Sequence, residues 1–135
     1  MSKILVDTSV WIDSLNGIKN KHSVLLNKFI EQDSTIVLCP IIVQEVLQGI
    51  RDDKQFEKVK HALSGFEILS IEPVEAAYGA AKLYRDFRKK GITIRKSNDC
   101  LIAFYAIYFK VQLFHNDSDF TRIAKHLELK IISAS

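Results

Sequence analysis

Four carboxylates stand at positions in the sequence that indicate chemistry. Asp7 and Asp117 follow short apolar runs typical of β-strands, so each is expected near a strand end. Glu45 and Asp99 lie within apolar stretches, where a carboxylate needs a hydrogen bond, a cation or a proton. Mg²⁺ and Mn²⁺ are hard ions that prefer oxygen ligands and would relieve the mutual repulsion of converging carboxylates. These residue types and positions therefore indicate a site for a divalent metal ion.

Each acid also has a purely structural interpretation. The three aspartates could cap the helices that follow them, and Glu45 could be an ordinary half-exposed helix residue. Their joint placement favours the metal site, because a doubly wound sheet brings strand-end acids to one edge. The residues four and seven positions after Asp99 are Ala103 and Ala106, and this small-residue face predicts room for a cleft.

Other catalytic chemistries find no support in the sequence. The four histidines share no ligand spacing, and each is expected at the surface or at an edge: His22, His61, His115 and His126. No glycine-rich phosphate loop, GxSxG turn or reactive Cys/His pair is present. A phosphoacceptor or phosphatase would want a second acid beside Asp7, and Thr8 and Ser9 stand there instead.

A cluster of basic residues precedes Asp99. The stretch from 85 to 96 contains one acid, Asp86, and six basic residues: Arg85, Arg88, Lys89, Lys90, Arg95 and Lys96. They could form a solvated helix end that complements the helix dipole. They are also candidates for RNA binding, because phosphate-binding charge would then lie next to metal-binding charge. The net charge of +3 would become +7 if a metal neutralised the four acids, which suits a polyanion binder.

Short apolar runs alternate with longer amphipathic ones along the chain. Strands are predicted at Lys3–Val6, Thr35–Leu38, Phe66–Leu69, Val111–Phe114 and Lys130–Ile132. Helices are predicted around Val24–Phe29, from Pro40 to near Gly49, around Phe56–Leu63, from Pro73 to Gly91, at Asn98–Phe109 and at Ser118–Leu127. This alternation predicts an α/β fold, a three-layer α/β/α sandwich with a mostly parallel sheet of about five strands.

The size and composition of the chain predict a single domain over residues 1–135. A hydrophobic content of 47% with 26% charged residues is ordinary for a globular protein, and no apolar run is long enough for a membrane span. The start of the sequence is expected to be a strand and not a signal peptide. Cys39 and Cys100 lie in apolar stretches, which predicts buried thiols in a reducing, cytoplasmic compartment.

Three segments of the sequence resemble the PIN domain, and more narrowly the VapC toxins of VapBC modules. They are Ile4–Asp13 (ILVDTSVWID), Ile94–Ala103 (IRKSNDCLIA) and His115–Phe120 (HNDSDF), with Glu45 between the first two. The resemblance runs over essentially the whole chain in the family's order and spacing.

That resemblance implies a metal-dependent endoribonuclease, the toxin of a type II toxin–antitoxin system, in which Mg²⁺ or Mn²⁺ and a water hydrolyse RNA. It also implies a homodimer and a VapB-type antitoxin whose C-terminal tail crosses the active site. The family's acids fall on Asp7, Glu45, Asp99 and Asp117, with Asp119 as a peripheral fifth and Thr8 or Ser9 as an assisting hydroxyl. Asp117 is expected to bind the metal directly, whereas Asp119 would begin the next helix and reach the metal through water at most.

Two other functions share these acids. A domain of this fold could bind RNA or a protein without cutting, although the intact acids favour cleavage. A structure-specific DNA nuclease would need additional helices for which 135 residues leave no room. Five aromatic residues are candidates for self-association and for an antitoxin groove, or else for the core: Trp11, Phe56, Tyr84, Phe87 and Tyr108.

Overall fold

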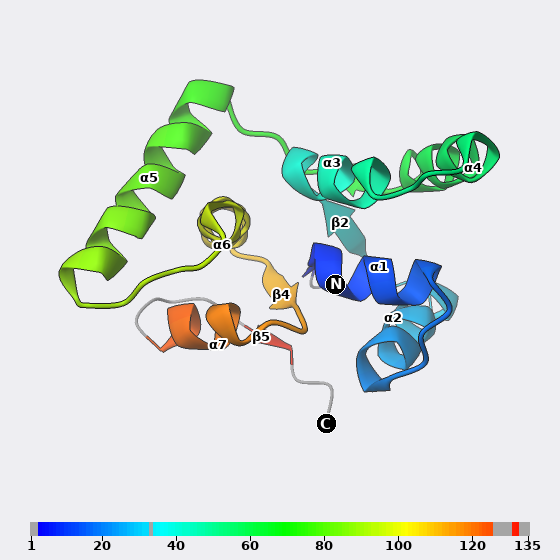
Figure 1. Ribbon diagram of the computed structural model, residues 1–135, viewed down its shortest axis with the longest axis horizontal. Helices are drawn as coiled ribbons and strands as arrows, with labels where there is room; N and C mark the ends of the chain where they lie inside the picture. The colour runs from blue at the N-terminus through cyan, green and yellow to red at the C-terminus, as the bar shows by residue number, and fades with distance from the viewer. Residues whose placement is uncertain (1–2, 33, 126–130, 133–135) are drawn as a thin grey trace.

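The computed structural model describes residues 3–32, 34–125 and 131–132. Its centre is a parallel sheet in which the strands lie in the order β3-β2-β1-β4-β5 (Figure 1). The strands are β1 (Ile4–Val6), β2 (Ile36–Leu38), β3 (Glu67–Ile68), β4 (Gln112–Phe114) and β5 (Ile131–Ile132). The predicted α/β architecture and its five parallel strands are confirmed.

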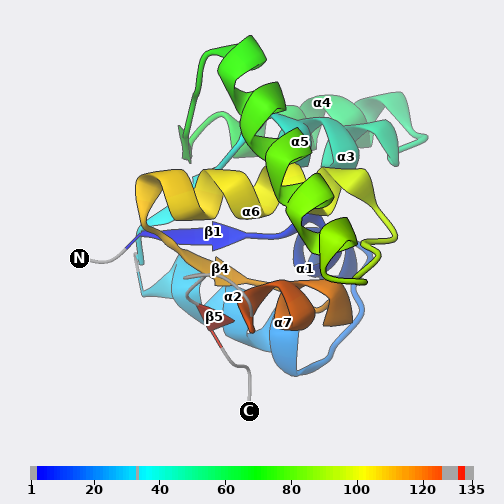
Figure 2. The same ribbon diagram turned by 90° about the vertical axis from the view of Figure 1, so that its left-hand side faces the viewer.

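Helices cover both faces of the sheet, so the three-layer arrangement is also as predicted. The helices are α1 (Thr8–Leu15), α2 (Lys21–Glu31), α3 (Pro40–Gln48), α4 (Asp53–Leu63), α5 (Pro73–Lys89), α6 (Ser97–Phe109) and α7 (Ser118–Ala124). Helices α6 and α7 lie on one side of the sheet and α1 and α2 on the other, as Figures 1 and 2 show. Helix α5 packs along the outside of α6.

The central strands are apolar because both of their faces are covered. Every residue of β1 and β2 is buried, the pattern expected of parallel strands between two helical layers. Proline at the first position of α3 and of α5 suits a helix start, since that position needs no hydrogen-bonded N–H. Cys39 and Cys100 are buried free thiols, as the sequence predicts.

Helix α6 is apolar almost all round and is enclosed by its neighbours. A Cβ on Gly79 of α5 would collide with the Phe104 ring, so the glycine permits the close approach of the two helices. Ala103 and Ala106 are buried in the core, which means that the prediction of a cleft beside them is wrong. Their small side chains allow close packing of α6, and neither alanine lines the cleft that borders Asp99.

The aromatic residues divide between core and surface. Trp11 and Phe87 are buried, and the Trp11 indole N–H donates to the Val6 carbonyl at 3.1 Å, so neither can form a docking surface. Phe56 and Tyr84 are half-buried, and Tyr108 is 55% exposed.

Helix α7 ends at Ala124. Three predictions lie outside the described residues: the extension of this helix to Leu127, the start of the last strand at Lys130, and the position of His126. No described helix combines the length and the apolar composition that crossing a membrane requires.

Candidate metal centre

The sheet brings the two strand-end acids to the same edge. Strands β1 and β4 are parallel neighbours, with Val6 paired with Phe114 at their carboxyl ends. The Asp7 N–H donates to the Phe114 carbonyl at 2.9 Å, and Asp117 follows three residues after Phe114. The sheet topology therefore places Asp7 and Asp117 at the same edge, as predicted for acids that follow the ends of parallel strands.

Asp7 is both a helix cap and a buried acid. Its carboxylate accepts the Ser9 hydroxyl at 2.7 Å and the Ser9 N–H at 3.3 Å, which caps α1. The residue is only 4% exposed, and burial raises the pKa of Asp7 despite these two bonds. Asp7 can therefore cap α1 and also belong to an acidic site, because the capping hydrogen bonds hold its carboxylate at the sheet edge.

Asp117 occupies the equivalent place before α7. Its carboxylate accepts the Asp119 N–H at 2.9 Å, and its own N–H donates to the His115 ring at 3.1 Å. Burial acts to raise the pKa of Asp117, but the Asp119 N–H and Lys96 together bring it below its usual value. Asp117, and not Asp119, is therefore the residue that caps the helix.

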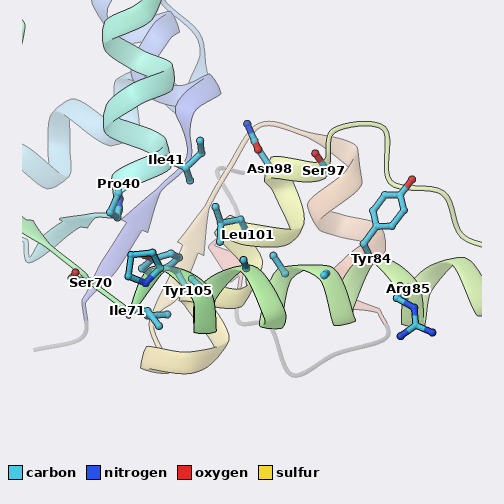
Figure 3. Close-up of a pocket in the computed structure, with 15 residues that line it drawn as sticks. Pro40, Ile41, Ser70, Ile71, Tyr84, Arg85, Ser97, Asn98, Leu101 and Tyr105 are labelled. Carbon is cyan, nitrogen blue, oxygen red and sulfur yellow. The ribbon is translucent and has the colours of Figure 1, made fainter.

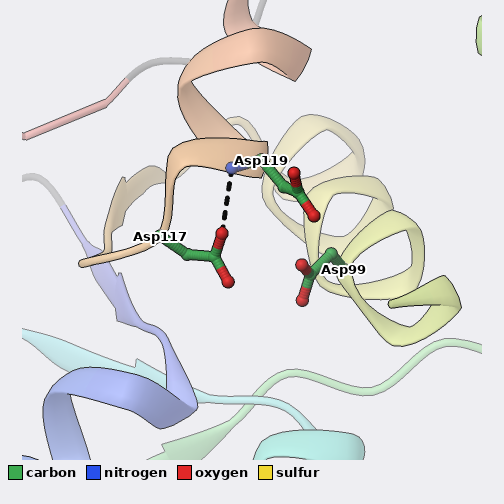
Figure 4. Close-up of side chains that lie close together, drawn as sticks. All are labelled: Asp99, Asp117 and Asp119. Carbon is green, nitrogen blue, oxygen red and sulfur yellow. Dashed lines mark hydrogen bonds between the residues drawn. The ribbon is translucent and has the colours of Figure 1, made fainter. Parts of the chain in front are cut away.

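Asp99, Asp117 and Asp119 form a compact group, the aspartate trio (Figure 4). Each contributes one carboxylate oxygen to a set whose members all lie within 4.8 Å of one another. Asp119 stands in the first turn of α7, as predicted, but it is 1% exposed and directed at Asp99. Asp119 is therefore a full member of the trio by position, and its expected peripheral role toward a metal ion stays a prediction.

Asp99 is the acid least compensated by the protein. It lies in the first turn of α6, is 5% exposed, and its Oδ2 has no hydrogen-bond partner among the described residues. Burial, and then the charges of Asp7 and Asp117, raise the pKa of Asp99 to about 7. A buried carboxylate oxygen without a donor, facing two further carboxylates, is the environment that a divalent cation would complete.

Glu45 joins the site from α3 and is held at both oxygens. The Thr8 hydroxyl donates to Oε1 at 2.7 Å and the Asn98 amide donates to Oε2 at 3.3 Å. No pattern in the sequence points to Asn98, whose only signal is that it directly precedes Asp99. The Thr8 hydroxyl thus contacts Glu45 and the Ser9 hydroxyl contacts Asp7, so each hydroxyl fixes the position of one acid.

A cleft of about 390 Å³, here called the acidic cleft, opens beside the trio. It is lined by Asp7, Thr8, Ser9, Ile12, Asp13, Glu45, Gln48, Lys96 and Asp99. Asp99 belongs to both the acidic cleft and the trio, so the two adjoin. The four acids singled out from the sequence therefore surround one continuous site, with Asp119 added.

Three basic side chains lie close to the acids of the trio. Arg95 lies 3.5 Å from both Asp117 and Asp119, and Lys96 lies 3.2 Å from Asp117 and has its pKa raised by that hydrogen bond. Arg122, three residues after Asp119, reaches it at 3.5 Å. The sequence indicates this ion pair only through the three-residue spacing of Asp119 and Arg122, because positions i and i+3 share a helix face.

The other basic candidates lie away from these acids. Arg85, Arg88, Lys89 and Lys90 are exposed at the end of α5, and within the described chain none makes an ion pair with the site. The Arg88 guanidinium instead lies over the Tyr84 ring at 5.8 Å. His115 directly follows the end of β4, so it lies at an edge of the sheet, one of the two positions expected; it is buried rather than at the surface, and its ring accepts the Asp117 N–H.

Comparison with known proteins places this site in a family. The PIN domain model matches residues 4–126, so the chain belongs to the PIN domain family. It is 31% identical over 131 residues to "Ribonuclease VapC11" of Mycobacterium tuberculosis, covering 96% of this chain and 98% of that protein.

Solved structures agree on the fold. VapBC2 from Rickettsia felis, bound to a DNA fragment from its promoter, contains a chain with a TM-score of 0.75 at 22% identity, covering 96% of this chain and 97% of that one. A toxin–antitoxin complex from Klebsiella pneumoniae gives a TM-score of 0.72 at 21% identity over 98% of both chains.

Proposed function

We propose that this protein is a metal-dependent endoribonuclease, the toxin component of a type II toxin–antitoxin system acting in the cytoplasm. The observation that carries the proposal is the buried Oδ2 of Asp99, which has no hydrogen-bond partner among the described residues and lies beside two further carboxylates. The relative at 31% identity is named a ribonuclease, which makes RNA the substrate class. Membership of the PIN domain family supports the same reaction.

Asp7, Asp99 and Asp117 would hold Mg²⁺ or Mn²⁺, and Glu45 would hold a second ion or orient a water. These all-oxygen ligands suit hard divalent cations and give no reason to expect zinc. When bound, such an ion lowers the pKa of a water and stabilises charge on the scissile phosphate. Asp119 would complete the trio, with its oxygens held by Arg95 and Arg122.

The chain's own residues orient the reacting groups. Hydrolysis joins a water oxygen to phosphorus, breaks one phosphodiester bond, and moves one proton from the water to the leaving oxygen. Glu45 is suited to direct that water because Thr8 and Asn98 fix both of its oxygens. The exposed basic residues at the end of α5, among them Arg85 and Lys89, would bind phosphates of the RNA further from the cleaved bond.

RNA cleavage and metal binding test the function together. The purified protein should cut single-stranded RNA in millimolar Mg²⁺ or Mn²⁺ and should lose that activity in EDTA. Millimolar Mn²⁺ should also raise the melting temperature, because a ligand that binds only the native state stabilises it. Metal binding and RNA binding without cleavage would instead indicate a binding module, and an unchanged melting temperature would contradict the metal site.

An antitoxin of the VapB type is the proposed protein partner. Chains of the same fold occur in VapBC2 of Rickettsia felis and in the Klebsiella pneumoniae toxin–antitoxin complex. Binding of the antitoxin across the acidic cleft would block RNA access. Co-expression with the product of a neighbouring small gene, followed by a cleavage assay of the purified complex, would identify it.

A homodimer is the proposed assembly, with the apolar pocket between α3, α5 and α6 as its contact surface (Figure 3). This pocket of about 570 Å³ includes Leu101, Tyr105 and four alanines of α5. Nearby on α5, Val74 and Tyr78 are 51% and 72% exposed, an apolar surface that a second copy would cover.

Sedimentation at micromolar concentration should therefore report twice the 15.4 kDa chain mass. Ala81→Glu places a charge in the exposed part of the pocket and should shift the protein to monomer, because burying an unpaired charge is costly. A wild-type protein that sediments only as monomer would contradict the dimer.

A further inference from the structure

Lys96 is the only basic residue that lines the acidic cleft in the part of the chain that the structure describes. Its Nζ donates to Asp117 Oδ2 at 3.2 Å, and the side chain is 60% exposed. Its backbone is fixed, because its carbonyl accepts the Asp99 N–H at 3.0 Å at the start of α6. A long, solvated side chain thus extends from an anchored position beside Asp99 toward the acids.

The two arginines of the site each have more hydrogen-bond and ion-pair partners than Lys96 among the described residues. Arg95 bridges Asp117 and Asp119 and also donates its backbone N–H to Asp119 at 3.4 Å. Arg122 contacts Asp119 and donates to the Thr93 carbonyl at 3.3 Å. In the part of the chain that the structure describes, the Lys96 side chain has one hydrogen-bond partner, the Asp117 carboxylate.

We propose that Lys96 is a catalytic residue with two alternative partners: it neutralises Asp117 in the metal-free protein and contacts the scissile phosphate once Asp117 holds a metal. This inference rests on the proposed ribonuclease function. Lys96 would therefore act as an internal counter-ion that becomes a substrate ligand.

The two roles compete at Asp117. An ammonium group and a divalent cation repel each other, so a metal ion bound at Asp117 would weaken the contact between the Lys96 ammonium group and Oδ2 of Asp117. Because the Lys96 backbone stays fixed, the displaced ammonium group remains over the acidic cleft, where the scissile phosphate must approach. Negative charge that develops on that phosphate in the transition state would then be stabilised by a positioned cation.

This double role predicts opposite effects of a single substitution. Lys96→Gln should tighten Mn²⁺ binding by about threefold to tenfold, because Asp117 loses a competing cation at 3.2 Å. The same change should lower kcat by roughly a hundredfold with little change in KM, since the lost contact forms in the transition state. Mn²⁺ affinity is measured by calorimetric titration in the absence of RNA, and cleavage by steady-state kinetics.

Two further variants provide controls. Lys58→Gln removes the same charge from an exposed position on α4 that lines no wall of the cleft, and it should change neither quantity. Lys96→Arg keeps a cation and should recover a large part of kcat, whereas a purely structural role would not depend on charge.

The outcomes separate this inference from the proposed function. Unchanged kcat in Lys96→Gln, or weaker Mn²⁺ binding, would overturn the role of Lys96 while wild-type cleavage upholds the ribonuclease. A wild-type protein that binds Mn²⁺ but cuts no RNA would overturn the ribonuclease and the phosphate contact together.

Discussion

Asp99→Asn is expected to reduce RNA cleavage by about a thousandfold or more, because it removes the charged ligand at the centre of the site. The change keeps the size of the side chain, so the fold should survive. Among the described residues, Asp99 is the one acid that belongs to both the trio and the acidic cleft. Cleavage at the parental rate in Mg²⁺ would contradict the assignment of the site.

The same substitution should stabilise the metal-free protein. Native Asp99 has a pKa of about 7 against 3.8 for the free side chain, so the folded state favours its neutral form. Above pH 4 the unfolded chain ionises first, and the native state therefore loses stability as the pH rises from about 4 to about 7. An asparagine does not ionise, so the variant should lack this loss.

Melting temperatures in EDTA between pH 4 and pH 8 measure this effect. At pH 7.5 the variant should melt about 2–4 °C above the wild type, a gain on the order of 1 kcal/mol. Burial raises the pKa of Asp7 too, which acts in the same direction, while the lowered pKa of Asp117 adds stability that is lost as the pH falls through it. If the melting temperatures of the wild type and the variant depended on pH in the same way, the raised pKa of Asp99 would be contradicted.

Mn²⁺ should reverse the order of the two proteins. With the ion present the wild type gains stability from binding and the variant gains little, so the wild type should melt higher. Asp53→Asn is a matched control, because it removes a carboxylate from an exposed position on α4 outside the site. It should leave cleavage and the response to Mn²⁺ unchanged.

Much of this site was predictable because it follows from local rules. Apolar runs set the strands, and the prolines at 40 and 73 set two helix starts, so the ends of β1 and β4 were placed to within a residue or two. Adjacent parallel strands then bring Asp7 and Asp117 together without any knowledge of side-chain packing. Glu45 and Asp99 were recognisable because a carboxylate is costly in an apolar stretch.

The remaining parts of the site depend on tertiary geometry. Asn98 contacts Glu45 and Arg122 contacts Asp119, and neither contact follows from spacing to a strand end. Ala103 and Ala106 indicated open space in the sequence, but small residues serve equally well for close helix packing, and packing decided the outcome. The direction of the Asp119 side chain likewise depends on how α7 packs beside α6, which the sequence does not reveal.

Asp117→Asn and Asp119→Asn should differ in their effects although both residues belong to the trio. Asparagine caps a helix about as well as aspartate, so Asp117→Asn should keep α7 intact and lose cleavage by orders of magnitude. Asp119 is paired with Arg95 and Arg122 at its two oxygens, so its role toward the metal should be largely to hold the site. Asp119→Asn should therefore cost about tenfold to a hundredfold in cleavage, the scale of losses around a metal ligand.

The two variants should rank in the opposite order in thermal stability: Asp119→Asn should lose more stability than Asp117→Asn. The ion pairs of Asp117 involve long, exposed side chains and contribute well under about 1 kcal/mol, so its variant should melt close to the wild type. Asp119 is 1% exposed, and its loss leaves two arginines with a neutral partner, which should cost about 1 kcal/mol or more. Cleavage rates and melting temperatures of both variants, measured side by side in Mg²⁺ and in EDTA, test this division. If Asp119→Asn abolishes cleavage as fully as Asp117→Asn while melting like the wild type, Asp119 is a direct metal ligand.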